Sequence, residues 1–323
     1  MRMSKTMAGM FMAAALASSG AQAAENGVIP TNLGTEGMQN LNIPPPGLYA
    51  LNYTNYFHAS QLNDKDGNKI KGLDANIDFL VNAVRFLSYV DVAHFGDSRL
   101  GILSDVAIPF GHVDASVGGV SGKQTGLADI SINPLSVYYK QGDWLNLGFS
   151  PTFTFLPTGQ WERQDPASLG RNYASWQPTI GYTMIFFDKL DVSGRFRYIH
   201  NFTNNDGAIS AVNPTGANYE SGDMIAWDFS VGYAITDKLQ LSLNGYYAAQ
   251  LEDDKIHGDR AANAVLQDVL DGGRSSVFAL GPAIGYDLGI ARVYAHWQHQ
   301  FESKNSAKGD SVWLRLATRL WPY

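Results

Sequence analysis

The sequence has no cysteine among its 323 residues, so disulfides, iron–sulfur clusters and thiol catalysis are all excluded. Beyond its first residues it also has no apolar run near the ~20 residues that a membrane-spanning helix needs, which argues against the inner membrane. Basic residues are fewer than acidic ones, 23 against 30, and the formal net charge is −7. Nucleic-acid binding needs a basic surface, so the sequence disfavours that class of function.

The first residues have the three parts of a secretory signal. Arg2 and Lys5 are basic, Met7–Ala17 is apolar and uncharged, and Ala21-Gln22-Ala23 fits the small-x-small rule for cleavage. The alternative is a membrane anchor, which is disfavoured because the apolar part is too short to span a bilayer. We therefore expect a signal peptide over residues 1–23.

Beyond the signal, clusters of Gly, Asn, Asp and Pro divide the chain into alternating stretches whose connections are by turns short and long. The short turns lie at 94–98, 141–143, 187–189, 236–238 and 288–290, and the long polar loops at 61–73, 112–126, 157–172, 203–222, 252–274 and 302–310. A soluble sandwich has no reason to sort its loops by length, whereas a transmembrane barrel has short periplasmic turns and long extracellular loops. The alternation of short and long connections predicts an all-β fold, an antiparallel transmembrane β-barrel of the bacterial outer membrane.

Twelve stretches alternate apolar and polar residues as half-buried strands do. They lie at 48–60, 74–92, 99–111, 126–140, 143–156, 173–187, 189–202, 223–235, 238–251, 275–288, 290–302 and 310–323. The apolar faces are expected to meet lipid and the polar faces the lumen, most clearly where Phe149 and Asn146 lie on opposite faces. Fourteen strands are the alternative, because the phase of the second stretch blurs at Arg85 and Phe86.

Residues 24–46 precede the first predicted strand and show no periodicity. They are rich in Gly, Asn and Pro and end in Pro44-Pro45-Pro46, yet they also contain several apolar residues: Val28, Ile29, Leu33, Leu41 and Ile43. Two interpretations stay open, a periplasmic tail or a plug that enters the lumen and narrows it. The barrel itself is expected over residues 47–323.

Charged residues on the predicted lumen face are the first candidates for a functional site. They are Asp105, Asp129, Asp191, Arg195, Arg197, Asp228, Arg315 and Arg319. One interpretation is a selectivity filter or substrate site, as charged rings form in pores. The other is a buried ion network that fills a small barrel and holds its register. Tyr139, Tyr246 and Tyr294 would add aromatic faces with hydroxyl groups, which suit aromatic solutes.

The sequence shows no motif for catalysis, a cofactor or a metal. His296 and His299 are three residues apart, so on one strand they face opposite sides and cannot chelate together. His200 and His257 lie near Asn and Asp residues, but such proximity is common in loops and does not define a catalytic group. Residues 259–273 have the pattern of a short amphipathic helix, either a lid over the mouth or a helix packed on a neighbouring loop.

Five segments resemble a known family: PPPGLYALNY (44–53), GLADISINPLSVYY (126–139), SGDMIAWDFSVGYAITDKLQL (221–241), GYYAAQLEDDK (245–255) and KNSAKGDSVWLRLA (304–317). They are similar to the outer-membrane proteins named for the meta-pathway of phenol degradation. The resemblance covers most of the mature chain and is strongest at PPPGLY and at the last hairpin. Members of this family resemble channel proteins whose genes lie near those of aromatic-degradation enzymes. The resemblance therefore implies uptake of hydrophobic aromatic compounds rather than an enzymatic activity.

The expected function is therefore a passive outer-membrane channel for small hydrophobic, aromatic compounds. The alternative is a non-transporting structural or adhesive barrel, with an outer-membrane hydrolase ranked below it. The expected partners are outer-membrane lipid and lipopolysaccharide, the barrel-assembly machinery and a small hydrophobic solute. No cofactor, metal or nucleic acid is expected.

Overall fold

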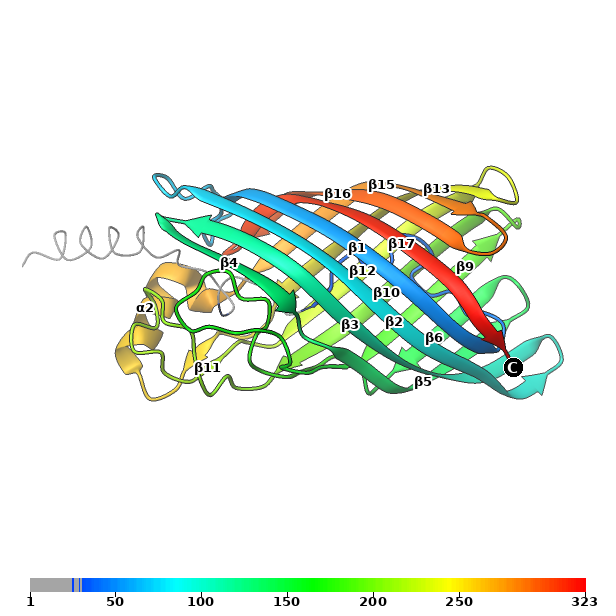
Figure 1. The fold of residues 1–323 in the computed structure, drawn as a ribbon, viewed down its shortest axis with the longest axis horizontal. Coiled ribbons are helices and arrows are strands. Elements are labelled where there is room, and N and C mark those ends of the chain that lie inside the picture. The colour runs from blue at the N-terminus through cyan, green and yellow to red at the C-terminus, as the bar shows by residue number, and fades with distance from the viewer. Residues whose placement is uncertain (1–24, 26–28, 30) are drawn as a thin grey trace, which may run out of the picture.

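A computed structural model describes residues 25, 29 and 31–323, so the predicted signal peptide lies outside the described residues. The chain forms one closed antiparallel barrel, with the C-terminus at one end and helix α2 (Arg260–Leu270) at the other (Figure 1). The ring closes where β1 (Gly47–Leu62) pairs with β17 (Ala307–Pro322) along their whole length. Among the described residues, no helix is both long and apolar enough to cross a membrane.

Twelve strands form the wall, which confirms the predicted number, and three of them are each interrupted once. Besides β1 and β17, the uninterrupted strands are β2 (Ala75–Phe95), β3 (Ser98–Val117), β10 (Leu190–Asn201), β12 (Met224–Ala234), β13 (Leu239–Gln250), β15 (Ser276–Asp287) and β16 (Arg292–Lys304). The interrupted strands are β4 with β5 (Val120–Leu127, Ser131–Gln141), β6 with β7 (Leu145–Ser150, Thr154–Phe155) and β8 with β9 (Ser175–Trp176, Thr179–Phe186). Outside the wall, β11 (Tyr219–Glu220) pairs with β14 (Lys255–Ile256) near α2.

Prolines lie in the region where these neighbouring strands are irregular. Pro134 lies within β5, Pro151 follows β6 and Pro178 precedes β9. Proline has no N–H to donate to a neighbouring strand, so the backbone ladder breaks there. Thr152 repairs part of the break, because its hydroxyl accepts from the N–H of Leu135 at 3.0 Å and donates to its carbonyl at 2.9 Å. Side chains therefore help to hold this part of the wall together.

Two segments that we expected as long loops, 112–126 and 302–310, are paired strand instead. β3 and β4 stay paired up to a Gly118-Gly119 turn, where both glycines have a positive φ, 58° and 85°. In 302–310, β16 pairs with β15 and β17 with β1, and the two strands are joined by a short turn. The loop prediction was wrong because these polar strand ends extend past the apolar part of the wall, where an apolar face is not needed.

The amphipathic helix predicted over 259–273 is present as α2. Asp259 caps it by accepting a hydrogen bond from the backbone N–H of Ala262 at 2.9 Å, and Gly272 follows its end with a φ of 71°. Its buried stripe of Ala262, Leu266 and Leu270 packs on Val212, Tyr219 and Ile256. The helix thus packs on a neighbouring loop, which was one of the two arrangements left open.

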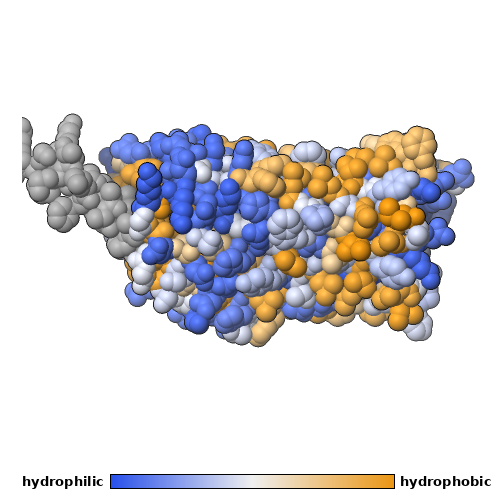
Figure 2. Space-filling model, turned by 90° about the horizontal axis from the view of Figure 1, so that it is seen from above, coloured by the Kyte–Doolittle hydropathy of each residue, from blue (hydrophilic) through white to orange (hydrophobic). Residues whose placement is uncertain are grey.

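The outer surface divides into an apolar band and a hydrophilic end. Figure 2 shows apolar residues over the part of the wall nearer the C-terminal end and hydrophilic residues toward the α2 end. Because short turns face the periplasm in such barrels, the C-terminal end is periplasmic and the α2 end extracellular. Large exposed side chains on the outside of the wall include Leu80, Phe86, Ile108, Phe149, Ile180, Leu243, Ile284 and Leu314.

Three histidines on the outside of the wall are each bonded to an aspartate on the neighbouring strand segment. The pairs are His58 with Asp78 at 3.0 Å, His200 with Asp223 at 2.9 Å and His299 with Asp310 at 3.0 Å. Two positions before each histidine, an aromatic residue donates to the same aspartate: Tyr56, Tyr198 and Trp297 respectively. Aromatic residues with a polar group gather at membrane–water interfaces, and we take these groups as part of such a girdle.

The expected facing of strands β1 and β2 was wrong. Ile77, Phe79 and Val81 line the lumen, although their apolar character predicts contact with lipid. Asn52 and Asn82 lie on the other face of the strands and hydrogen-bond to each other at 2.9 and 3.0 Å, so each satisfies the amide of its neighbour. Alternation cannot decide the facing of a strand that has apolar residues on both faces.

Tyr139, which we expected in the lumen, also faces the other way. The register of β3 and β5 shifts between Leu103 and Asp105, and such a shift moves every later side chain to the opposite face. Tyr138 is therefore buried inside the barrel, whereas the hydroxyl of Tyr139 donates to Ser98 at 3.0 Å.

The facing can be tested by placing the same charge on each side of the wall. Phe149→Arg should lower the free energy of unfolding by about 2–4 kcal/mol, because it places a guanidinium against lipid. Phe79→Arg is the matched control and should cost clearly less, since its side chain lines the cavity. The measurement is reversible unfolding in lipid vesicles with urea, and equal costs would show that one of the two facings is wrong.

The orientation can be tested with epitope tags. Tags in 203–222 or 252–274 should bind antibody on intact cells, because these connections lie at the α2 end. Tags in 236–238 should bind antibody only after the outer membrane is permeabilised. The reverse pattern would contradict the assignment of the two ends.

Candidate functional site: an arginine cluster in the lumen

The described residues of 25–46 lie inside the barrel and follow its polar wall from one end to the other. Glu25 accepts a hydrogen bond from Asn204, at the extracellular end, at 2.7 Å. Farther down, the hydroxyl of Thr31 donates to Gln177 at 2.9 Å, and the backbone N–H of Asn40 donates to Ser193 at 2.9 Å. The segment therefore runs through the lumen and joins β1 at the periplasmic rim.

Two glycines let this segment approach the wall closely. Gly34 and Gly37 have φ values of 68° and 66°, a conformation that other residues rarely adopt. A Cβ atom at Gly34 would collide with the side chain of Gln298, and one at Gly37 would collide with the ring of His296. The residue between them that carries charge is Glu36, which the two glycines place near the middle of the lumen.

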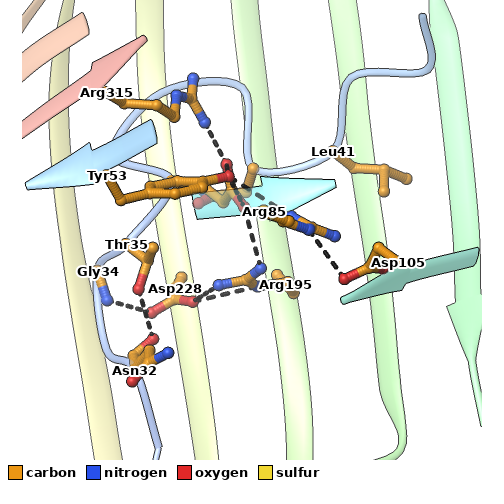
Figure 3. A network of polar contacts seen from close by, with 12 residues as sticks. Asn32, Gly34, Thr35, Leu41, Tyr53, Arg85, Asp105, Arg195, Asp228 and Arg315 are labelled. Carbon is orange, nitrogen blue, oxygen red and sulfur yellow. Dashed lines mark hydrogen bonds and ion pairs between the residues drawn. The ribbon is translucent and has the colours of Figure 1, made fainter. Parts of the chain in front are cut away.

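Glu36 is bound by groups from four different wall strands. Its Oε1 lies 3.3 Å from Nη1 of Arg85 on β2 and 3.5 Å from Nη1 of Arg195 on β10. Its Oε2 is bonded to Nη1 of Arg315 on β17, and the hydroxyl of Tyr53 on β1 donates to the carboxylate at 3.4 Å (Figure 3). One carboxylate thus connects opposite sides of the barrel.

Two aspartates on the wall hold the same arginines from behind. Asp105 accepts from Nε of Arg85 at 2.9 Å. Asp228 accepts from Nη2 of Arg195 at 2.9 Å, from Nη2 of Arg197 at 2.6 Å and from the backbone N–H of Gly34 at 2.8 Å. Charge-assisted bonds of this kind fix both the position and the plane of a guanidinium. The arginines are therefore oriented by the wall and point toward Glu36.

The cluster carries more positive than negative charge. Four guanidinium groups (Arg85, Arg195, Arg197 and Arg315) face three carboxylates (Glu36, Asp105 and Asp228). The side chains of Arg85 and Arg195 are 19% and 18% exposed, so part of each remains open to the lumen. The centre of the lumen is therefore a positively charged constriction.

A cavity of about 1040 Å³ extends on both sides of this constriction and is lined by two unlike surfaces. One surface is the inner face of β1, β2 and β3, where the lining residues are mainly apolar: Leu51, Phe57, Ile77, Phe79, Val81, Ala83, Ala107, Pro109 and Val113. The other surface is formed largely by residues 31–45 and by the polar wall behind them. The lumen therefore offers an apolar path beside a polar one.

The structure brings together six of the eleven residues that the sequence singled out. Arg195 and Arg197 are both bonded to Asp228, and Asp105 is bonded to Arg85. The guanidinium of Arg315 lies 4.0 Å from the centre of the Tyr294 ring. All six lie around Glu36.

The other five predicted residues lie elsewhere, Tyr139 among them as described above. Asp129 pairs with Arg171 at 2.8 Å, toward the extracellular end. Arg319 lies at the periplasmic rim, where its guanidinium is bonded to the carbonyl of Pro46. Tyr246 is buried within the polar wall and accepts from Gln300 at 3.0 Å.

Asp191, which the sequence also placed in the lumen, is buried and is bonded to Gln240 rather than to an arginine.

Sequence reasoning missed Glu36, Arg85 and Tyr53. Glu36 lies outside any strand, so no periodicity points to it, although it is an acidic residue in an otherwise uncharged stretch from Asn26 to Pro46. Arg85 lies where the alternation of apolar and polar residues in its strand becomes irregular. Tyr53 alternates with Asn52 and Thr54, so the residue pattern places it on the apolar face that was expected to meet lipid. Only the closed ring shows that these residues meet.

The histidines behave as their spacing predicts. His296 faces the lumen and is bonded to the carbonyl of Gly34 at 2.9 Å, while His299 is on the outside with Asp310. Within residues 25, 29 and 31–323, no three metal-ligating side chains come close enough to hold an ion.

The extracellular end of the segment is anchored in the loops. Glu25 accepts from Asn204 and also from the backbone N–H of Ala208, at 2.7 and 2.5 Å. Burial raises the pKa of Glu25 to about 7, although both hydrogen bonds act in the opposite direction. These loops and α2 lie at the extracellular end of the barrel (Figure 1).

A family model described as the putative MetA-pathway of phenol degradation matches residues 59–316. Among solved structures, an outer membrane channel from Pseudomonas putida F1 has a TM-score of 0.74 at 16% identity, covering 87% of this chain and 98% of that one. The β domain of the Bordetella autotransporter BrkA has a TM-score of 0.51 at 10% identity, covering 86% and 100%. At such identities the likeness shows the fold alone, which is that of an outer-membrane barrel. No curated protein sequence matches the chain significantly.

The ion network can be tested as a structural element. Asp228→Ala removes the carboxylate that Arg197 is paired with and one of the two that contact Arg195. It should lower the free energy of unfolding by about 3–5 kcal/mol. Asp287→Ala is the control and should cost much less, because its pair with Arg292 lies near the surface. Urea unfolding in lipid vesicles gives both values. Similar small costs would show that the network does not stabilise the barrel.

Proposed function

We propose, from the premise that the chain belongs to the family described as the putative MetA-pathway of phenol degradation, that it is a passive outer-membrane channel for small hydrophobic, aromatic solutes. The observation that carries the proposal is the apolar surface of β1, β2 and β3 inside the barrel. An outer-membrane barrel that only conducts water and ions has a polar interior. Apolar residues turned inward lose their contact with lipid. Ile77 and Phe79 pack in part on a cluster that contains the loop residue Leu169. A hydrophobic solute in the lumen would cover the part of their surface that faces the cavity.

The size and chemistry of the cavity fit such a solute. Its volume of about 1040 Å³ is enough for a small aromatic molecule and the water around it. Phe57 and Phe79 are paired across β1 and β2 and line the lumen together. Aromatic side chains contact aromatic solutes in stacked or edge-to-face geometries that favour them over aliphatic molecules of the same size.

Residues 31–46 narrow the passage in this proposal. Residues 31–40 fill the polar side of the lumen, and below the constriction at Glu36 the segment crosses to the apolar side, where Leu41 and Ile43 pack on it. Above the constriction, the apolar surface that lines the cavity is left to the solute. A transport channel needs binding that is weak enough for the solute to leave. A surface of small and medium apolar residues such as Val81, Ala83 and Ala107 provides contact without a closed pocket.

A non-transporting structural or adhesive barrel is the second candidate. The observation that favours it is the buried ion network, since charge pairs that fill a lumen can serve stability alone. The two candidates differ in one respect that can be measured: only the channel lets a solute enter the cavity and pass the constriction.

Single-channel recording in planar bilayers tests the proposal. Benzamide should cause brief interruptions of the ionic current, whereas acetamide, which lacks the ring, should cause none. Phe79→Ser should shorten these interruptions several-fold, since a buried aromatic contact contributes on the order of 1 kcal/mol. Lys123→Gln, which changes a residue on the extracellular hairpin, is the control.

Deletion of residues 25–43 tests the role of the segment in the same recordings. The deletion should raise the conductance, because it removes the backbone that fills the polar side of the lumen. No current from either the complete protein or a correctly folded deletion variant would contradict the channel and favour the structural barrel.

A further inference from the structure

We propose that the guanidinium groups around Glu36 form a binding site for aromatic carboxylates, and that Glu36 occupies this site as an internal ligand that the solute replaces. The inference rests on the proposed channel function and names the solute more closely. It starts from the fact that Glu36 is not part of the wall. The arginines are fixed on strands, whereas the carboxylate between them comes from a segment laid into the lumen.

Groups other than Glu36 hold the arginines in their orientation. Arg85 is held by Asp105 and Arg195 by Asp228, in each case on the side away from Glu36. Arg315 lies over the ring of Tyr294, 4.0 Å from its centre. Each guanidinium thus has its own support on the wall. A planar carboxylate that enters from the cavity would meet donors already in position, which lowers the entropic cost of binding.

The charges require an anion at this point. Without Glu36, four guanidinium groups would face only Asp105 and Asp228, which leaves two positive charges uncompensated in the lumen. A neutral solute cannot compensate them. A carboxylate can, and it also matches the fork of N–H donors that a guanidinium presents.

The apolar surface begins directly beside the arginines. Arg85 and Ala83 are two residues apart on β2, so both face the lumen at a separation of about 7 Å along the strand. Tyr53 pairs with Ala83 across β1 and β2, and Val81 lies two positions before Ala83 on the same face of β2. A carboxylate at Arg85 would therefore place an attached ring against Ala83 and Val81. The solute that fits both parts is a small aromatic monocarboxylate.

Glu36 is attached in a way that allows replacement. Gly34 and Gly37 flank it, and glycine changes its backbone conformation at little steric cost. Because Glu36 is tethered beside the site, its effective concentration there is high, and a free carboxylate competes only weakly. Weak binding is what a channel needs if the solute is to leave again.

Calorimetry on the detergent-purified protein tests the site apart from transport. The probes are benzoate and benzamide, which have similar size and differ in charge. Glu36→Gln removes the internal anion and should tighten benzoate binding about tenfold, which corresponds to about 1.4 kcal/mol. Benzamide binding should stay unchanged. Lys123→Gln, far from the lumen centre, should bind both probes as the unmodified protein does.

A double variant separates the site from general effects on the barrel. Glu36→Gln with Arg315→Gln restores the net charge of the unmodified protein, and benzoate binding should return to its level or below. Loss of heat-modifiable migration would identify a variant that has not folded, and Arg85→Lys, which keeps the charge but loses the fork, then replaces the double variant. Arg85→Lys should weaken benzoate binding relative to the unmodified protein.

Equal benzoate binding by the unmodified protein, Glu36→Gln and the arginine variants would overturn the anion site. Failure of the channel proposal has a different signature, namely no ionic current and no interruption by benzamide. Benzoate binding that follows the charges, in a protein without current, would support the site and contradict transport.

Discussion

The ion pairs of Glu36 are the interaction on which the rest of the lumen depends. A carboxylate removed from water costs several kcal/mol unless charge and hydrogen bonds replace its hydration. Here Arg85, Arg195 and Arg315 come from β2, β10 and β17, which meet only because the sheet closes. The closed ring therefore makes the site possible. In return, the site ties residues that are far apart around the ring to one point on the N-terminal segment.

The segment explains why the interior is divided into unlike halves. A barrel wall that faces backbone needs hydrogen-bonding side chains, since buried N–H and C=O groups must be satisfied. Asp228 and Ser193 on the wall accept from the backbone N–H groups of Gly34 and Asn40. Gln177 accepts from the hydroxyl of Thr31. The inner face of β1 to β3 meets the apolar residues Leu41 and Ile43 of the segment below the constriction and lines the cavity above it, so it can be apolar. The polar half thus holds residues 31–40, and the apolar half above the constriction remains for a solute.

The fold could be predicted from the sequence, but the site could be predicted only in part. Alternation and loop rhythm locate twelve strands because lipid imposes an apolar face on every crossing. They fail in β2, where Phe79 and Phe86 point to opposite faces and both faces are apolar. They also fail at Tyr139, since a shift of register leaves no mark in the residue pattern. Charged lumen residues such as Arg195 and Arg315 stand out on a strand, whereas Glu36 does not, because its position depends on a segment without periodicity.

The contacts of the segment also determine which part of it can move. Its upper end is anchored by Glu25 in the extracellular loops, and Pro46 is bonded to Arg319 and Tyr323 at the periplasmic rim. Below the constriction, Leu41 and Ile43 pack with Leu87, Tyr89, Leu103 and Tyr138 in an apolar cluster.

Withdrawal of the whole segment would break all of these contacts together. A movement of the Glu36 side chain alone breaks the ion pairs, which an incoming anion can replace, and keeps the bonds of Gly34 to Asp228 and His296. In the exchange that we propose, one carboxylate therefore replaces another while the backbone of the segment stays in place.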